Sequence, residues 1–347
     1  MSRFPRSTPA LAAALGLSAL LVPAVSGAAA VVLEPTGATT LTLQPATARV
    51  LSSLGVKVAP AGPARAHAGG AIAFPITGGR VHSLATGAAT VDHSGGLVFS
   101  AHGTRLKVTD FRVRLGASPL LTAKAGGARI PLLKLDASKA KITFTNGANL
   151  KVSNVRGALT PQAARALNAT FGVTAFTGGI RIGTTTTKAT AYSTAVTLDP
   201  ALASALSGAG ITAAPIGPAG ADHAGRLVFP VSGGGLSRTT FAGDVPHLGG
   251  IRLAKGSTKV DLTAFTVRTS VTPPDLTAEV GGARASILSV GLQGVMPSVA
   301  KGTVVLPGAT LTLTPAAAGL LNQAFGLGST LTGTTAFGTA TVRAPVR

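Results

Sequence analysis

The sequence contains no cysteine, no tryptophan, a single tyrosine and only 10 acidic residues among its 347. Without cysteine no disulfide can form, so buried apolar surface and backbone hydrogen bonds must hold the fold together. Thiol nucleophiles are excluded as well, and no Gly-x-Ser-x-Gly elbow is present to supply a serine nucleophile. No glycine pair is followed by the Lys-Ser/Thr helix start of a P-loop, which favours hairpin turns at these pairs.

The chain repeats itself over a long interval. LTAKAGGAR, from Leu121, returns as LTAEVGGAR from Leu276, 155 positions later. LTPQAARALNATFG, from Leu159, returns as LTPAAAGLLNQAFG from Leu313, 154 positions later. Solenoid repeats have periods of roughly 20–50 residues, so this spacing indicates a duplicated domain. We predict domain 1 over residues 31–188 and domain 2 over 189–347, and we favour site residues that recur in both.

The first thirty residues have the layout of a secretory signal peptide. Arg3 and Arg6 give a basic start, an apolar run follows from Ala10 to Val22, and small residues precede position 30. The run is shorter than the roughly 20 apolar residues of a membrane-spanning helix. We therefore expect a signal peptide over 1–30, no transmembrane segment, and a protein that is secreted or held at the cell wall.

The rest of the sequence is typical of short antiparallel strands. Thr, Val, Gly and Ala dominate, and segments such as Thr39–Leu43 and Ser193–Leu198 alternate apolar and polar residues. In RLKVTDFRVRL this alternation changes parity at Thr109–Asp110, and the second copy changes parity at the matching place, which predicts a β-bulge. The pattern predicts a mainly β fold with two tandem antiparallel β-sandwich or barrel-like domains.

A short helix is expected after each Leu-x-Pro. Thr160 is placed to cap one such helix, Pro161 to occupy its first position and Gly172 to end it. Similar helices are expected after Gln44, Asp199 and Thr314.

Catalytic residues are not predicted. A hydrolase would need paired carboxylates or a nucleophile with a base. The acidic residues are not repeated between the copies, since Asp110 corresponds to Ala264 and Glu279 corresponds to Lys124. We therefore expect a non-enzymatic protein.

Histidine is the residue type that recurs most suggestively. His93 in VDHSGGLVF corresponds to His247 in VPHLGGIRL, and His67 lies in a context similar to that of His223. A neutral imidazole is a common ligand for transition metals and haem iron, whereas a histidine beside Gly-Gly also suits an ordinary surface turn. The spacing of His93 and His102 is not a zinc pattern, so no metal site is predicted.

The charge is strongly positive, with 30 Lys and Arg and a net charge of +20. This balance favours contact with anionic polymers of a cell wall. The basic residues are spread singly without interleaved aromatics, which argues against a nucleic-acid partner. Arg129 and Arg284, one after each GGA, recur and suit either an anion site or an exposed strand position.

The segment from Phe74 to Leu115, with FPITGG and GAATVDHSGGLVFSAHGTRLKVTDFRVRL, resembles the HtaA domain of secreted actinobacterial haem-uptake proteins. LLTAKAGG continues the match, and FPVSGG, GDVPHLGGIRL, VDLTAFTVRT and LTAEVGG form a second one. The resemblance spans about 68–135 and 224–290 and implies β-rich domains that bind haem through a tyrosine and a histidine. His93 and His247 match the histidine; the family's Trp and Tyr segment has no counterpart, since Tyr192 lies at the domain junction.

The leading hypothesis is therefore a secreted or cell-envelope HtaA-like binding protein without enzymatic activity. Its expected ligand is haem or another flat small molecule, with His93 and His247 as first candidates for binding it and His67 and His223 as second candidates. The alternative is a structural or adhesive wall-associated protein that binds anionic polymer through its basic surface.

Overall fold

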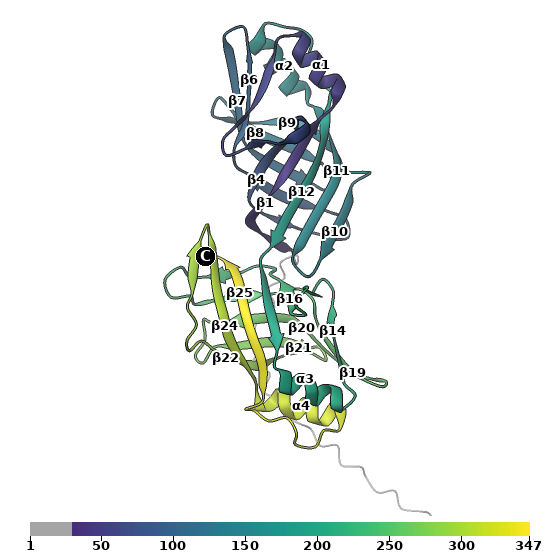
Figure 1. Cartoon of the computed structure of the whole chain (residues 1–347), viewed down its shortest axis with the longest axis vertical. Helices are drawn as coiled ribbons and strands as arrows, with labels where there is room; N and C mark the ends of the chain where they lie inside the picture. The colour runs from purple at the N-terminus through teal and green to yellow at the C-terminus, as the bar shows by residue number, and fades with distance from the viewer. Residues whose placement is uncertain (1–29) are drawn as a thin grey trace, which may run out of the picture.

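The computed structural model describes residues 30–347 and confirms the mainly β fold, with two antiparallel barrel-like bodies that follow one another along the chain (Figure 1). The expected signal peptide lies outside the described residues, apart from its last position. In chain order, β12 (Arg181–Ala191) is the last strand of a 12-stranded sheet, and β13 (Ser193–Leu198) is the first strand of a 13-stranded sheet. We propose that the two domains meet at Tyr192, between these strands. Within residues 30–347, no helix has the length and apolar character needed to cross a membrane.

The sheet of domain 1 closes on itself. Its strands follow the order β7-β5-β4-β1-β12-β11-β9-β8, and β8 pairs with β7 again, which makes a closed barrel. Strands β6 and β2 extend the sheet beyond β7, while β3 and β10 pair with β4 and β11. Besides β12, the strands are β1 (Val31–Leu43), β2 (Lys57–Ala61), β3 (Arg65–Ala66), β4 (Ile72–Val81), β5 (Ala89–His93), β6 (Gly96–Ala101), β7 (Thr104–Leu115), β8 (Leu120–Ala125), β9 (Ala128–Asp136), β10 (Lys141–Thr145) and β11 (Asn149–Leu159).

Domain 2 repeats this order with a looser closure. Its strands follow the order β20-β21-β22-β24-β25-β13-β16, and β18 pairs with β20 on the other side. Between β16 and β18, a single bridge from Val231 to His247 closes the path. Domain 1 has Ile76 paired with His93 at the corresponding place. Besides β13, the strands are β14 (Thr212–Ile216), β15 (Gly220–Ala221), β16 (Leu227–Pro230), β17 (Gly235–Leu236), β18 (Gly243–Pro246), β19 (Gly250–Lys255), β20 (Thr258–Arg268), β21 (Asp275–Val280), β22 (Ala283–Gly291), β23 (Ser298–Ala300), β24 (Thr303–Leu313) and β25 (Ala336–Pro345).

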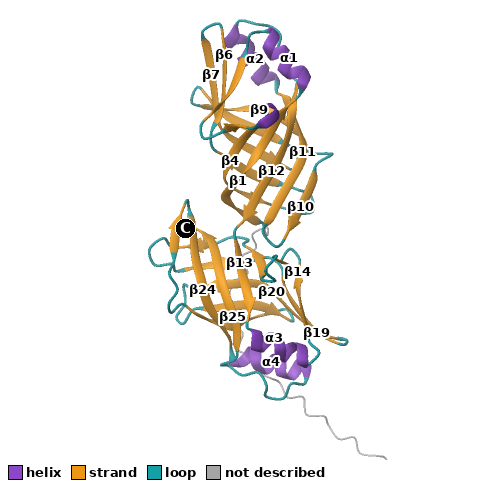
Figure 2. Cartoon of the chain, in the orientation of Figure 1, coloured by secondary structure: helices purple, strands orange, loops and turns teal. Residues whose placement is uncertain are grey.

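The α-helices lie at the outer ends of the two domains (Figure 2). Thr160 Oγ1 accepts a hydrogen bond from the Ala163 N–H at 3.1 Å, and Gly172 ends the helix with φ 65°, as the sequence predicts. A Pro at the first helical position suits these starts because the missing N–H has no helical partner there. The α-helices are α1 (Pro45–Ser53), α2 (Pro161–Phe171), α3 (Pro200–Gly208) and α4 (Pro315–Phe325), and a short 3₁₀ turn, η1, spans Ala68–Gly70.

The predicted bulge is present in both domains. Asp110 has φ 52° and Ala264 has φ 50°, and the strand register shifts at both places. Such a bulge turns the next side chain to the other face of the strand. Phe111 is thereby buried and meets the Phe74 ring edge-on, with ring centroids 4.9 Å apart.

The two domains are joined by backbone and side-chain bonds. Val32 of β1 donates to the Val231 carbonyl at 3.0 Å, and Tyr192 donates to the Val32 carbonyl at 2.9 Å. Arg343 of β25 holds both carboxylate oxygens of Glu34 of β1, at 2.7 and 2.8 Å. Through these contacts, β1 of domain 1 is bound to residues of domain 2.

A candidate ligand cavity in domain 1

Domain 1 contains an apolar cavity of about 360 Å³ between the barrel wall and helices α1 and α2. Its walls are chiefly Leu, Val, Ile, Phe and Ala side chains, including Leu51 of α1 and Leu167 of α2. Small-molecule sites typically measure about 300–1,000 Å³ and have such walls. The exposed lining residues lie beside the helices and mark a mouth there: Gln44, Ala46, Val50, Ala175 and Arg181.

The interior of domain 2 is filled at the equivalent place. Its cavities measure about 40 and 20 Å³. One cause of this difference is a glycine in domain 1 that is a leucine in domain 2. The strand register shows that they hold the same position, because Gly157 pairs with Gly183 and Leu311 pairs with Gly338. Gly157 lines the large cavity, and Leu311 is 2% exposed in the filled core. A leucine side chain thus occupies the volume that a glycine leaves open.

A second exchange acts in the same direction. Ile182 precedes Gly183 and lines the cavity of domain 1, whereas Phe337 precedes Gly338 and lines both small cavities of domain 2. The larger aromatic ring closes space that isoleucine leaves. The difference between the two interiors therefore follows from side-chain volume within one shared backbone plan.

His93 lies in the wall of this cavity, at the end of β5, and is 4% exposed. Its Nε2 is 2.7 Å from Thr39 Oγ1, and its Nδ1 is 3.3 Å from the Phe111 carbonyl oxygen. A carbonyl only accepts, so Nδ1 carries the proton and Nε2 accepts from the Thr39 hydroxyl. Burial lowers the pKa of His93 to about 4, so the ring is neutral at pH 7.

His247 has matching surroundings in domain 2. Its Nε2 is 2.7 Å from Thr194 Oγ1, and the rings of Phe229 and Phe265 meet edge-on at 5.0 Å. Burial lowers its pKa to about 4, and its Nδ1 has no hydrogen-bond partner within residues 30–347. It borders only the cavity of about 20 Å³. The recurring pair thus has the same fold position but very different free space.

His67 and His223 are exposed and line none of these cavities. The His67 N–H donates to the Ala71 carbonyl in a turn. In domain 2 the matching N–H belongs to Asp222, one residue before His223, and donates to the Arg226 carbonyl. The structure therefore brings His93 to the cavity and leaves both residues of this second pair on the surface at positions that do not correspond.

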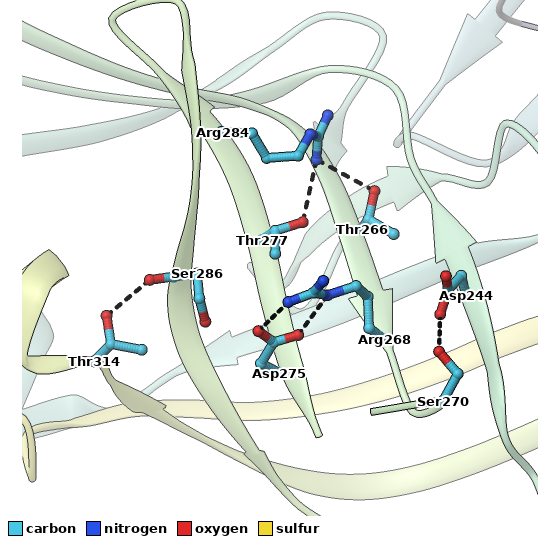
Figure 3. Close-up of polar contacts among 9 residues, drawn as sticks. All are labelled: Asp244, Thr266, Arg268, Ser270, Asp275, Thr277, Arg284, Ser286 and Thr314. Carbon is cyan, nitrogen blue, oxygen red and sulfur yellow. Dashed lines mark hydrogen bonds and ion pairs between the residues drawn. The ribbon is translucent and has the colours of Figure 1, made fainter. Parts of the chain in front are cut away.

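The recurring arginines hold the bulge. Arg129 Nη1 donates to the Asp110 carbonyl at 2.9 Å and to Thr122 Oγ1 at 3.1 Å. Arg284 Nη1 makes the same bonds, to the Ala264 carbonyl at 3.0 Å and to Thr277 Oγ1 at 3.1 Å. Figure 3 shows the Arg284 bonds to Thr277 and Thr266 beside the separate Arg268–Asp275 ion pair. These contacts give both arginines a structural role on an exposed strand.

Two features of the site were not predicted from the sequence. Thr39, the partner of His93, lies 54 residues away on another strand, so local spacing gives no sign of it. Gly157 was detectable, because the 154-residue spacing of the repeat places it opposite Leu311. Across residues 30–347, no group of three or more His, Cys, Asp and Glu is placed to hold a metal ion.

No protein-family model and no curated protein matches the sequence. Among solved structures, the chain is similar to the crystal structure of the C-terminal domain of HtaA from Corynebacterium glutamicum, at 15% identity and a TM-score of 0.35. The alignment covers 46% of this chain and 99% of that one, a share the size of one domain.

Proposed function

We propose that the protein is a non-enzymatic binding protein whose first domain holds a small apolar molecule inside its barrel. The observation that carries the proposal is the cavity of about 360 Å³, at the place where domain 2 is filled by Leu311. Unfilled core volume lowers stability roughly in proportion to its size. A hollow copy beside a filled copy of the same fold therefore points to a ligand that occupies the hollow one.

The chemistry of the walls favours an uncharged body for this ligand. The lining is mostly hydrocarbon, and the His93 ring at its edge is neutral at pH 7. Burying a charge among such side chains without a partner is strongly unfavourable. The charged lining residue Arg181 lies at the exposed mouth, away from the His93 end.

Haem is the candidate that the sequence resemblance implies. His93 would have to release the Thr39 hydroxyl to ligate iron, because its other ring nitrogen faces the Phe111 carbonyl. The Tyr192 hydroxyl donates to the Gly302 carbonyl at the domain junction, so it supplies no phenolate to this cavity. These residues fit an apolar ligand without a metal bond better than they fit a haem iron.

We further propose that the protein acts outside the cell, as its expected signal peptide implies. Domain 2 then acts as a filled support, coupled to domain 1 through Glu34 and Arg343. Attachment to anionic wall polymer through the basic surface stays a separate prediction, tested by binding that salt reverses.

A titration with N-phenyl-1-naphthylamine, an uncharged dye that brightens in apolar surroundings, tests the binding function. We expect one dye molecule per chain, with binding lost in Gly157→Leu and unchanged in His247→Ala. A parallel haemin titration reports a Soret shift if iron is ligated. A shift lost in His93→Ala and kept in His247→Ala would make haem the ligand; absence of both dye and haemin binding would contradict the proposal.

A further inference from the structure

The cavity of domain 1 has polar lining residues at its mouth, Gln44, Thr47 and Arg181, and a second polar group farther inside. There the hydroxyls of Thr39, Thr185 and Thr187 line the cavity beside His93, and we call these four side chains the hydroxyl pole. Thr185 and Thr187 lie two residues apart along β12, so both are on the inward face of the strand. Three strands, β1, β5 and β12, thus bring the hydroxyl pole together.

Two of these hydroxyls occur only in the hollow domain. Thr185 pairs with Leu41 and Thr187 with Thr39 across β1 and β12. In domain 2, Ala340 pairs with Val196 and Val342 with Thr194, across β13 and β25. The filled domain therefore keeps the Thr–His pair but replaces the other two threonines with apolar residues. The domain with the large cavity is therefore also the domain with the two additional hydroxyls.

The hydrogen bonds of the hydroxyl pole have a defined direction. Since the Thr39 hydroxyl donates to His93 Nε2, its oxygen must accept from the Thr187 hydroxyl, 2.8 Å away. Thr187 has then used its proton and keeps lone pairs as acceptors. Within residues 30–347, the Thr185 hydroxyl reaches only the Val155 carbonyl, at 3.5 Å, which is too long for a strong bond. The two residues can offer a ligand one acceptor and one donor.

We propose that the hydroxyl pole binds the hydroxyl group of an apolar alcohol, whose hydrocarbon body fills the remaining cavity. The inference rests on the proposed function and names the ligand class for the same cavity. An alcohol donates to Thr187 and accepts from Thr185 without bringing a charge into the interior. A carboxylate would need a cation, and the one Lys or Arg in the described lining is Arg181, at the mouth.

Displacement of N-phenyl-1-naphthylamine by decane, 1-decanol and decanoate tests this inference. Thr187→Val and Thr185→Ala copy the residues of domain 2, so both variants should fold. We expect each to weaken 1-decanol binding about two- to tenfold, the value of one net hydrogen bond, and to leave decane binding unchanged. Thr184→Ala, which removes an exposed hydroxyl from the same strand, is the matched control and should change neither.

The outcomes separate this inference from the proposed function. If the wild type binds the dye but Thr187→Val affects decane and 1-decanol equally, the hydroxyl pole has no role in recognition and the inference fails alone. It also fails if decanoate binds most tightly and Arg181→Ala removes that preference. If the wild type binds no dye, the cavity function fails as well.

Discussion

Gly157 and Leu311 occupy the same position in two duplicated barrels, one paired with Gly183 and the other with Gly338. The first leaves a cavity of about 360 Å³ in its domain, whereas the second is 2% exposed in a packed core. One side chain, aided by the exchange of Ile182 for Phe337, thus separates a hollow domain from a filled one.

Gly157→Leu should convert domain 1 into a filled domain. A Cβ atom at Gly157 would lie 2.9 Å from Leu133 Cδ1, the movable end of a flexible side chain, so the change requires only a local shift. We expect dye binding to fall at least about tenfold while the free energy of unfolding stays equal or rises, because lost cavity volume adds stability. Ile182→Phe should act alike, and unaltered dye affinity in both variants would refute the assignment.

Leu311→Ala should open space in the core of domain 2 and so destabilise it. Removing a buried leucine side chain lowers the free energy of unfolding by about 2–5 kcal/mol. Met296→Ala is the control, because Met296 is 84% exposed and surface changes usually stay within about 0.5 kcal/mol. Urea unfolding measures both variants, and equal midpoints for them would mean that Leu311 packs no core.

Stability should fall as the pH drops from about 6.5 to about 4. His93 and His247 have folded pKa values lowered from 6.5 to about 4 by burial, so only the unfolded chain takes up protons between these values. The loss is on the order of 3 kcal/mol per histidine and is complete below pH 4. The lowered pKa of Asp222 acts below 3.8, outside this window.

Urea unfolding at pH 7.5 and 4.5 measures this dependence, and His247→Gln should remove about half of it. Parallel pH profiles for the variant and the wild type would show that the buried imidazole does not govern the effect.

Local sequence signals predicted the parts of the fold that depend on neighbouring residues. The parity change at Thr109–Asp110 predicted the bulge, and the cap, proline and glycine around α2 predicted that helix. Each of these signals lies within a few residues of the structure it specifies. The cavity differs, because it depends on volumes contributed by strands that are far apart in sequence, and the Thr39–His93 bond joins two such strands.

Loss of either recurring arginine should weaken its domain slightly. Arg129 and Arg284 each bond a bulge carbonyl and a threonine on an exposed face. Arg129→Ala and Arg284→Ala should each lower the free energy of unfolding by about 1 kcal/mol, the usual net value of such bonds. Dye binding should stay unchanged. A loss of phosphate binding with no change in stability would instead favour the anion site that the sequence left open.

The Glu34–Arg343 pair predicts an asymmetric effect at the domain junction. The Glu34 side chain is 2% exposed and the Arg343 side chain 41%. Arg343→Ala leaves a carboxylate buried without a partner and should cost about 3–5 kcal/mol. Glu34→Ala leaves an arginine that reaches water and should cost clearly less. Calorimetric unfolding compares the two variants, and a larger loss for Glu34→Ala would contradict the assigned burial.

The number of N-phenyl-1-naphthylamine molecules bound by the wild type and by Gly157→Leu tests the central claim most directly. One hollow and one filled domain predict a single site per chain in the wild type and none in the variant. Two sites per chain, or one site that survives Gly157→Leu, would contradict the account.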